Sequence, residues 1–201
     1  MIEADWERIE TWGSENAPRM LEDLNEGASA DQISALEAEL GLEVPDEFRR
    51  SLQVHDGESD GWPNKVFANR GAYLGTERIL QEWQQRLEFG IGVLEDDEEQ
   101  DREQQIRDGV ISVVGPVKPD TFCKEWIPIM ECNGDVFWAL DLSPAEGGAP
   151  GQLIEVDWEA CSWRVVANSF GEFLSSYASS LETGKYRIAD GLPVEDGAAE
   201  L

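Results

Sequence analysis

Basic side chains are scarce in this sequence of 201 residues: 15 Lys and Arg stand against 43 Asp and Glu, for a formal net charge of −28 at pH 7. Affinity for a nucleic-acid backbone comes from Lys and Arg that release its counterions, so this balance excludes non-specific nucleic-acid binding. An anionic membrane surface is excluded for the same reason. Because there is also no long apolar run and no basic stretch before an apolar signal core, we expect a cytoplasmic protein without a membrane span.

Histidine and cysteine are scarce as well. The single histidine, His55, argues against histidine-dependent catalytic triads and histidine-rich metal sites. Cys123, Cys132 and Cys161 cannot all pair with one another and show no C-x-x-C spacing, which indicates reduced thiols. The sequence therefore predicts no disulfide framework, no metal and no cofactor.

Hydrophobic residues are plentiful enough for a folded core: they make up 41% of the chain and include eight Trp. High charge here does not mean disorder, and one domain is the default at this length. We place that domain at residues 1–188. Residues 189–201 are small and acidic and are expected to form a flexible tail.

Helical patterns occupy the first part of the chain. Ser29-Ala-Asp-Gln32 has the spacing of a capping box and precedes a stripe of Ile33, Leu36 and Leu40, with Gly41 as the stop. Further helices are expected around residues 6–9, after Pro18, after Pro45, and within 73–89.

Strand patterns begin at residue 126. Trp126–Glu131 and Asp135–Leu142 flank Asn133-Gly134, a strong signal for a hairpin with a two-residue turn, and the alternation of the second strand indicates one face on the core. A second hairpin is expected from 152–158 and 163–167, and Ser169–Glu172 opens a closing helix. This order predicts a single-domain α+β fold, with an antiparallel-dominated sheet packed against N-terminal helices and a C-terminal helix.

Each motif that could indicate catalysis or metal binding lacks a required residue or the required spacing. Asp56-x-Glu58-x-Asp60-Gly61 resembles the start of a calcium loop, but its twelfth position is Phe67 instead of a bidentate Glu. Asp135 and Asp141 lie roughly 20 Å apart along an extended strand and cannot act as an acid–base pair. No nucleophile elbow or phosphate-binding loop is present, so we expect no enzyme and no catalytic residues.

Five tryptophans leave one alternative open, a ligand groove or undetected active site near the paired carboxylates. Tryptophans of this kind are more often core anchors, since each buries a large area. We therefore expect most of them to lie in the core: Trp62, Trp126, Trp138, Trp158 and Trp163.

Short motifs in a fixed order carry a family resemblance. They are Ile9-Glu10-x-Trp12, Gly27-Ala28-Ser29, Val44-Pro45, His55-Asp56-Gly57, Trp126-Ile-Pro-Ile129, Leu140-Asp141-Leu142 and Gly151-Gln152. This series resembles the SUKH superfamily, whose members are similar to the fungal Smi/Knr cell-wall assembly regulators. The chain departs from the usual pattern at Asn133-Gly134 and at Ala139, where close members carry a Gly-Asp turn and a Cys.

The resemblance implies an α+β fold and a non-catalytic, protein-binding role. Bacterial members are often immunity proteins that bind and neutralise a cognate toxin, whereas fungal members are interaction hubs with disordered flanks. Because this chain has little flanking sequence, we expect an immunity protein whose partner is a basic toxin domain such as a nuclease. The alternative is a regulatory scaffold in cell-wall assembly or signalling.

Acidic clusters are the expected partner-binding residues, since a negative surface steers a basic partner towards it. The segment 95–108 is expected to be an acidic loop insertion, or else a short exposed helix. A purely solubilising role for the acidity is the alternative, and the oligomeric state is left open. The candidates are Asp56, Glu58, Asp60, Glu95, Asp96, Asp97, Glu98 and Glu99.

Overall fold

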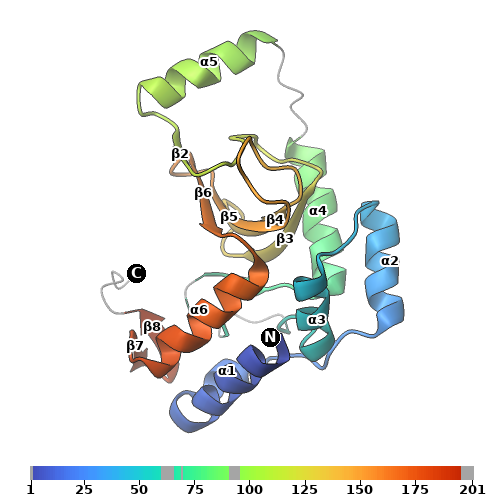
Figure 1. Cartoon of the computed structure of the whole chain (residues 1–201), viewed down its shortest axis with the longest axis vertical. Helices are drawn as coiled ribbons and strands as arrows, with labels where there is room; N and C mark the ends of the chain where they lie inside the picture. The colour runs from blue at the N-terminus through green and yellow to red at the C-terminus, as the bar shows by residue number, and fades with distance from the viewer. Residues whose placement is uncertain (1, 60–65, 69, 91–95, 196–201) are drawn as a thin grey trace.

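The computed structural model describes residues 2–59, 66–68, 70–90 and 96–195 (Figure 1). Within these residues the chain forms six α-helices, one 3-10 helix and eight strands. In chain order they are α1 (Ile2–Asn16), η1 (Pro18–Leu21), α2 (Ala30–Leu40), α3 (Asp46–Val54), β1 (Ala72–Tyr73), α4 (Thr76–Gly90), α5 (Asp96–Arg107), β2 (Ser112–Val114), β3 (Trp126–Glu131), β4 (Val136–Asp141), β5 (Gln152–Asp157), β6 (Ser162–Ala167), α6 (Phe170–Glu182), β7 (Tyr186–Ala189) and β8 (Leu192–Glu195). None of the described helices is long and apolar enough to cross a membrane.

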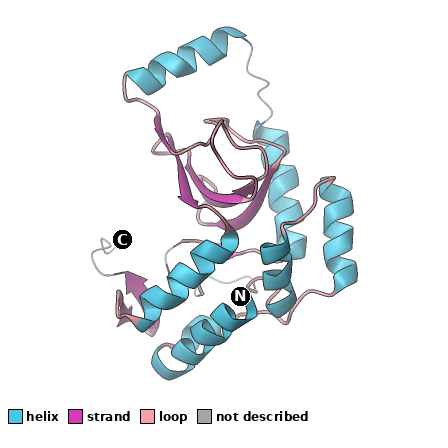
Figure 2. Ribbon diagram, viewed as in Figure 1, coloured by secondary structure: helices cyan, strands magenta, loops and turns pink. Residues whose placement is uncertain are grey.

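The main sheet has six strands in the order β1-β3-β4-β5-β6-β2. Figure 2 draws the strands in magenta and the helices around them in cyan. Its pairs are antiparallel except β2 with β6, which is parallel. Figure 1 shows α1 beside α6 on one side of this sheet and α5 beyond its far end. The predicted α+β class, with an antiparallel-dominated sheet, N-terminal helices and a closing helix, is confirmed.

Both faces of the central strands are buried, which differs from the expectation of a single core face. On one face Trp138 and Leu140 join a large core built with the helices. On the other face Phe137 and Ala139 join a second core with Trp126, which also contains residues from the 111–122 segment. That segment lacks a strong periodic pattern, so the second cover was not visible in the alternation of the strand.

Local signals place the helix and hairpin boundaries. The Ser29 side chain accepts from the backbone of Gln32 at 3.3 Å, and Gly41 ends α2 with φ of 65°. The β3–β4 hairpin forms as predicted, but its loop spans residues 132–135, and only Gly134 within it has positive φ. The Asn133 Oδ1 atom accepts from the Val136 amide at 3.1 Å, and this hydrogen bond stabilises the longer turn.

Regular structure extends further along the chain, to residue 195, than the sequence analysis predicts. Residues up to 195 form the β7–β8 hairpin, turned at Asp190-Gly191 with φ of 52° and 80°. Arg19 donates to the Asp190 carbonyl at 2.6 Å, and Tyr186 is buried in the large core. Residues 189–195, which the sequence analysis places in the tail, thus belong to a hairpin with apolar and hydrogen-bonding contacts to the rest of the fold. Residues 196–201 lie outside the described part.

Replacing the cap residue Ser29→Ala is expected to lower the free energy of unfolding by about 1 kcal/mol, because the Gln32 amide loses its acceptor. Urea unfolding measures this change. Ser34→Ala, an exposed change inside the same helix, is the matched control and is expected to be neutral or slightly stabilising. Equal effects of the two substitutions would contradict the capping role.

Candidate functional site

The first predicted acidic cluster is used inside the fold. Asp56 accepts from the backbone amide of Thr76 at 2.6 Å and from its hydroxyl at 3.0 Å, and so caps the start of α4. Both carboxylate oxygens of Asp56 are engaged in this way. Asp60 lies outside the described residues.

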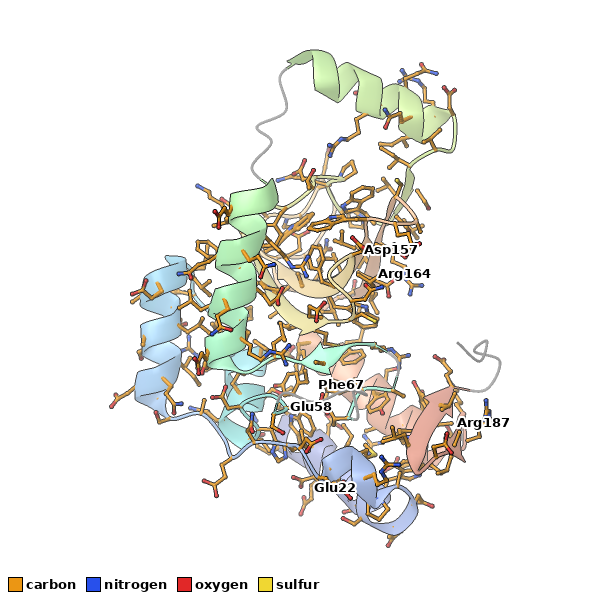
Figure 3. The ribbon with its side chains drawn as sticks, turned by 180° about the vertical axis from the view of Figure 1, so that it is seen from behind. Glu22, Glu58, Phe67, Asp157, Arg164 and Arg187 are labelled. Carbon is orange, nitrogen blue, oxygen red and sulfur yellow. The ribbon has the colours of Figure 1, made fainter. Side chains whose placement is uncertain are left out.

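Glu58 is buried, with 4% of its surface exposed, and it is labelled in Figure 3. Its carboxylate accepts from the amides of Val66 at 2.9 Å and Tyr73 at 3.0 Å, joining two segments of the interior. The prediction that Glu58 faces a partner is therefore wrong, because a buried carboxylate must be hydrogen-bonded where it lies. Phe67, the twelfth position of the apparent calcium loop, is a fully buried core ring.

The second predicted cluster belongs to a helix. Asp96, Asp97, Glu98 and Glu99 lie in the first turns of α5, where only the backbone is described, and Glu95 lies outside the described residues. The segment thus follows the exposed-helix alternative in place of a loop. Further along α5, Arg102 reaches Asp120 at 3.9 Å and Ile106 packs on the second core. Partner binding by these four acids remains a prediction.

The paired carboxylates Asp135 and Asp141 are separated as expected. Asp135 is exposed before β4, whereas Asp141 is fully buried at the other end of that strand. Asp141 accepts from the Ser143 amide and from the Gln152 Nε2 atom, both at 3.0 Å. Gln152 also donates to the Pro116 carbonyl at 2.9 Å, so Asp141 organises the surrounding loops.

The tryptophans follow their sequence predictions where they are described. Trp126, Trp138 and Trp163 are buried, Trp158 is half-buried, and Trp62 lies outside the described residues. Burial and the neighbouring Glu125 raise the pKa of the Cys123 thiol to about 12, which leaves it a poor nucleophile at neutral pH.

A groove lined partly by residues of the large core is the feature that sequence reasoning missed. It consists of a cavity of about 490 Å³ and an adjoining one of about 270 Å³, which share Arg70, Val166 and Glu195. We call this pair of cavities the Arg70 groove. Its walls come from the sheet, from α6 and from the C-terminal hairpin: Ala68, Trp138, Glu155, Arg164 and Val165 line the first cavity, and Ala167, Glu172, Phe173, Ser176, Tyr177, Ser180, Lys185 and Tyr186 line the second.

Arg70 is held at the centre of this groove by aromatic rings. Its guanidinium carbon lies 5.7 Å from the ring centroid of Trp138, 5.8 Å from Tyr177 and 5.9 Å from Tyr186. Its Nη1 atom donates to the Tyr186 hydroxyl at 2.8 Å, and its Nη2 atom contacts a Glu195 carboxylate oxygen at 3.3 Å. With about a fifth of its side chain exposed, Arg70 presents a positioned cation to the groove.

The sheet wall continues along one cross-strand row. Strand register places Trp138 opposite Glu155, Glu155 opposite Arg164, and Arg164 opposite Val114. Arg164 donates to both oxygens of Glu155 at 2.8 Å, and Figure 3 shows Arg164 close to Asp157 on the sheet. The exposure of the side chains rises along this row, from the buried Trp138 to Val114, which is 57% exposed.

The arrangement offers binding groups. Arg70, Arg164 and Lys185 provide hydrogen-bond donors, Glu155, Glu172 and Glu195 provide acceptors, and the aromatic rings provide apolar contact. Among the described residues no three His, Cys, Asp or Glu side chains are grouped closely enough to hold a metal ion. No local sequence signal marks Arg70, because its partners come from the sheet, from α6 and from the C-terminal hairpin, all distant in the sequence. The hairpin itself could have been found from Asp190-Gly191.

These features define an α+β domain with a mixed sheet and a groove walled by its last helix and its C-terminal hairpin. The model of the SMI1 / KNR4 family (SUKH-1) matches residues 27–176. The chain belongs to that family, in agreement with the resemblance of its motifs.

Curated relatives of the chain are fungal proteins named as regulators. A glucan synthesis regulatory protein of Neurospora crassa is 28% identical over 93% of this chain and 40% of its own length. The cell wall biosynthesis/cell cycle regulator smi1 of Schizosaccharomyces pombe is 28% identical over 93% and 37%, and the cell wall assembly regulator SMI1 of Saccharomyces cerevisiae is 22% identical over 92% and 41%. The chain thus spans about two-fifths of the length of these relatives. Their names favour the regulatory alternative over the immunity role.

Replacing Glu58→Gln is expected to lower the free energy of unfolding by about 1–3 kcal/mol. The side-chain NH₂ of glutamine would face the backbone N–H of Val66 or of Tyr73, and that buried N–H would lose its acceptor. Urea unfolding measures the loss. Glu39→Gln, an exposed change with the same chemistry, is expected to change it by less than about 0.5 kcal/mol. A Glu58 variant as stable as the control would mean that this carboxylate is not a structural acceptor.

Asp141 is expected to leave a pH signature. Burial raises the pKa of its carboxyl, against the hydrogen bonds from Ser143 and Gln152, which lower it. A carboxyl with a raised folded-state pKa stabilises the fold fully below its unfolded pKa of about 3.9, and that stabilisation is lost as pH rises through the folded-state pKa.

The free energy of unfolding of the wild type minus that of Asp141→Asn is therefore expected to fall as pH rises across this window. Urea unfolding of both proteins at matched pH values gives the difference, in which the titration of their shared carboxyls cancels. A difference that stays constant or rises with pH would contradict the raised pKa.

Proposed function

We propose that this chain is a non-catalytic, protein-binding domain of a cell-wall regulatory protein, and that the Arg70 groove receives a segment of its partner. The observation that carries the proposal is the groove itself, in which a positioned arginine and aromatic rings meet a concave wall. The names of the fungal relatives, which are those of regulators of glucan synthesis and cell-wall assembly, support the regulatory context.

The residue types of the groove support protein binding. Arginine, tryptophan and tyrosine are enriched at the energetic centres of protein interfaces, because each combines a large contact area with a directed polar group. Trp138, Tyr177 and Tyr186 form such a set around Arg70. Since these side chains are already fixed by packing, binding would cost little additional side-chain entropy.

The local charge pairs would add specificity. The Arg164–Glu155 pair lies at the rim, with 52% of the Arg164 side chain exposed. Rim charges of this kind act on partner choice and association rate more than on total affinity. A partner with a complementary pattern would be preferred over a merely apolar one.

The immunity alternative differs in the partner it requires. A basic toxin domain would be attracted by the net charge of −28, and its association would weaken as salt screens that attraction. A regulatory scaffold would instead associate with cell-wall or signalling proteins. The identity of captured partners, together with the salt dependence of capture, separates the two functions.

The groove is tested by quantitative capture of partners from the cells that express the protein, with Arg164→Glu as the groove variant. Arg107→Glu is the matched control, because Arg107 is also an exposed arginine paired with a glutamate, and it lies on α5. We expect the groove variant to lose roughly three- to ten-fold of specific partner recovery and the control to retain it.

Thermal unfolding of both variants verifies that they are folded to the same extent. Partners that stay bound to the Arg164 variant but leave the Arg107 variant would move the docking site to α5. Recovery of a secreted toxin as the main specific partner of the wild type would identify an immunity protein and overturn the regulatory role.

A further inference from the structure

We infer that the partner segment that occupies the Arg70 groove is acidic, and that one of its carboxylates takes the place of Glu195 on Arg70. This inference rests on the proposed function and specifies the chemistry of the partner at the same site. Three basic side chains line this groove although the chain as a whole is strongly acidic: Arg70, Arg164 and Lys185.

The guanidinium of Arg70 is pre-organised for a planar acceptor. The three aromatic rings around it restrict its orientation, and the Tyr186 hydroxyl accepts from its Nη1 atom at 2.8 Å. Its Nη2 atom lies 3.3 Å from a Glu195 carboxylate oxygen, and both residues line both cavities. A fixed guanidinium favours a carboxylate, because the two planar groups form parallel hydrogen bonds.

Glu195 shows that Arg70 can bind a carboxylate, and its own carboxylate is weakly held on Arg70. The contact is 3.3 Å long, and 54% of the Glu195 side chain is exposed. Exposed ion pairs of this geometry contribute little to stability, so a better-placed carboxylate can displace this one. Glu195 lies at the end of β8 and lines both cavities, so the C-terminal hairpin acts as a resident competitor for the groove.

The charged side chains that line the groove favour a short segment whose acidic side chains carry one negative charge each. Glu155, Glu172 and Glu195 line the groove beside its cations, so a phosphate, with a charge of about −1.5 to −2, would meet more repulsion than a carboxylate. The net charge of −28 opposes a whole acidic protein. At physiological salt the screening length is about 8 Å, so contacts within the groove decide the binding of a short segment.

The test is the binding of a short, fluorescein-labelled peptide of alternating glutamate and alanine, followed by fluorescence anisotropy. The matched peptides replace glutamate with glutamine or with phosphoserine. We expect binding of the glutamate peptide, no binding of the glutamine peptide, and weaker binding of the phosphoserine peptide. Glu195→Gln is expected to raise the affinity for the glutamate peptide roughly two- to five-fold, because it removes the competing carboxylate.

Two groove variants and a control complete the design. Arg70→Lys keeps the charge but loses the planar fork, and is expected to lower the affinity roughly ten-fold. Arg164→Glu is expected to lower it roughly three- to ten-fold, whereas Arg107→Glu on α5 leaves it unchanged. Thermal unfolding of each variant verifies its fold, and the exposed Arg164 serves as the decisive position if Arg70→Lys is unstable.

Each outcome separates the inference from the proposed function. Glutamate and glutamine peptides that bind equally well would overturn the acidic partner but leave a peptide-binding groove. Preferred binding of the phosphoserine peptide would overturn the carboxylate assignment. No binding to the wild type or to Glu195→Gln at millimolar peptide would overturn the inference, and the proposed function would still stand if Arg164→Glu loses its captured partners.

Discussion

The packing of the Arg70 guanidinium among aromatic rings is the interaction on which the Arg70 groove depends. Trp138 comes from the sheet, Tyr177 from α6 and Tyr186 from the C-terminal hairpin, so one side chain joins three elements that are far apart in the sequence. A cation in this position is stabilised by the rings and by Tyr186, and at the same time remains partly open to solvent.

The acidity of the chain has two different roles. Glu58 and Asp141 are buried and accept hydrogen bonds from groups that the fold has to satisfy. Many other carboxylates lie on the surface and determine the field that a partner meets at long range. The groove contrasts with that field, because its cations act at short range, and this contrast explains how an acidic protein can favour an acidic segment.

Sequence reasoning found those features that are specified locally. The Ser29–Gln32 capping box, the hairpin around Asn133-Gly134 and the closing helix each depend on residues a few positions apart. The parallel pairing of β2 with β6 was missed, because a strand as short as Ser112–Val114 has no detectable period and joins a strand some fifty residues later. The second core was missed for a related reason, since its cover comes from an irregular segment.

The candidate site was the least predictable part. A cluster of acids in the sequence indicates charge but not direction, so Glu58 looked like a surface residue although its carboxylate is directed to buried amides. Arg70 had no distinguishing neighbours in the sequence, because its contacts are set by tertiary structure. The family resemblance indicated the fold correctly, and the names of the fungal relatives favour the regulatory alternative that the sequence left open.

A structure of the chain bound to the segment of its captured partner tests the central claim most directly. The account predicts a partner carboxylate on the Arg70 guanidinium, the segment lying along the row from Trp138 to Arg164, and Glu195 displaced from its present contact. A partner bound to α5 or to the N-terminal helices, with the Arg70–Glu195 contact intact, would contradict it.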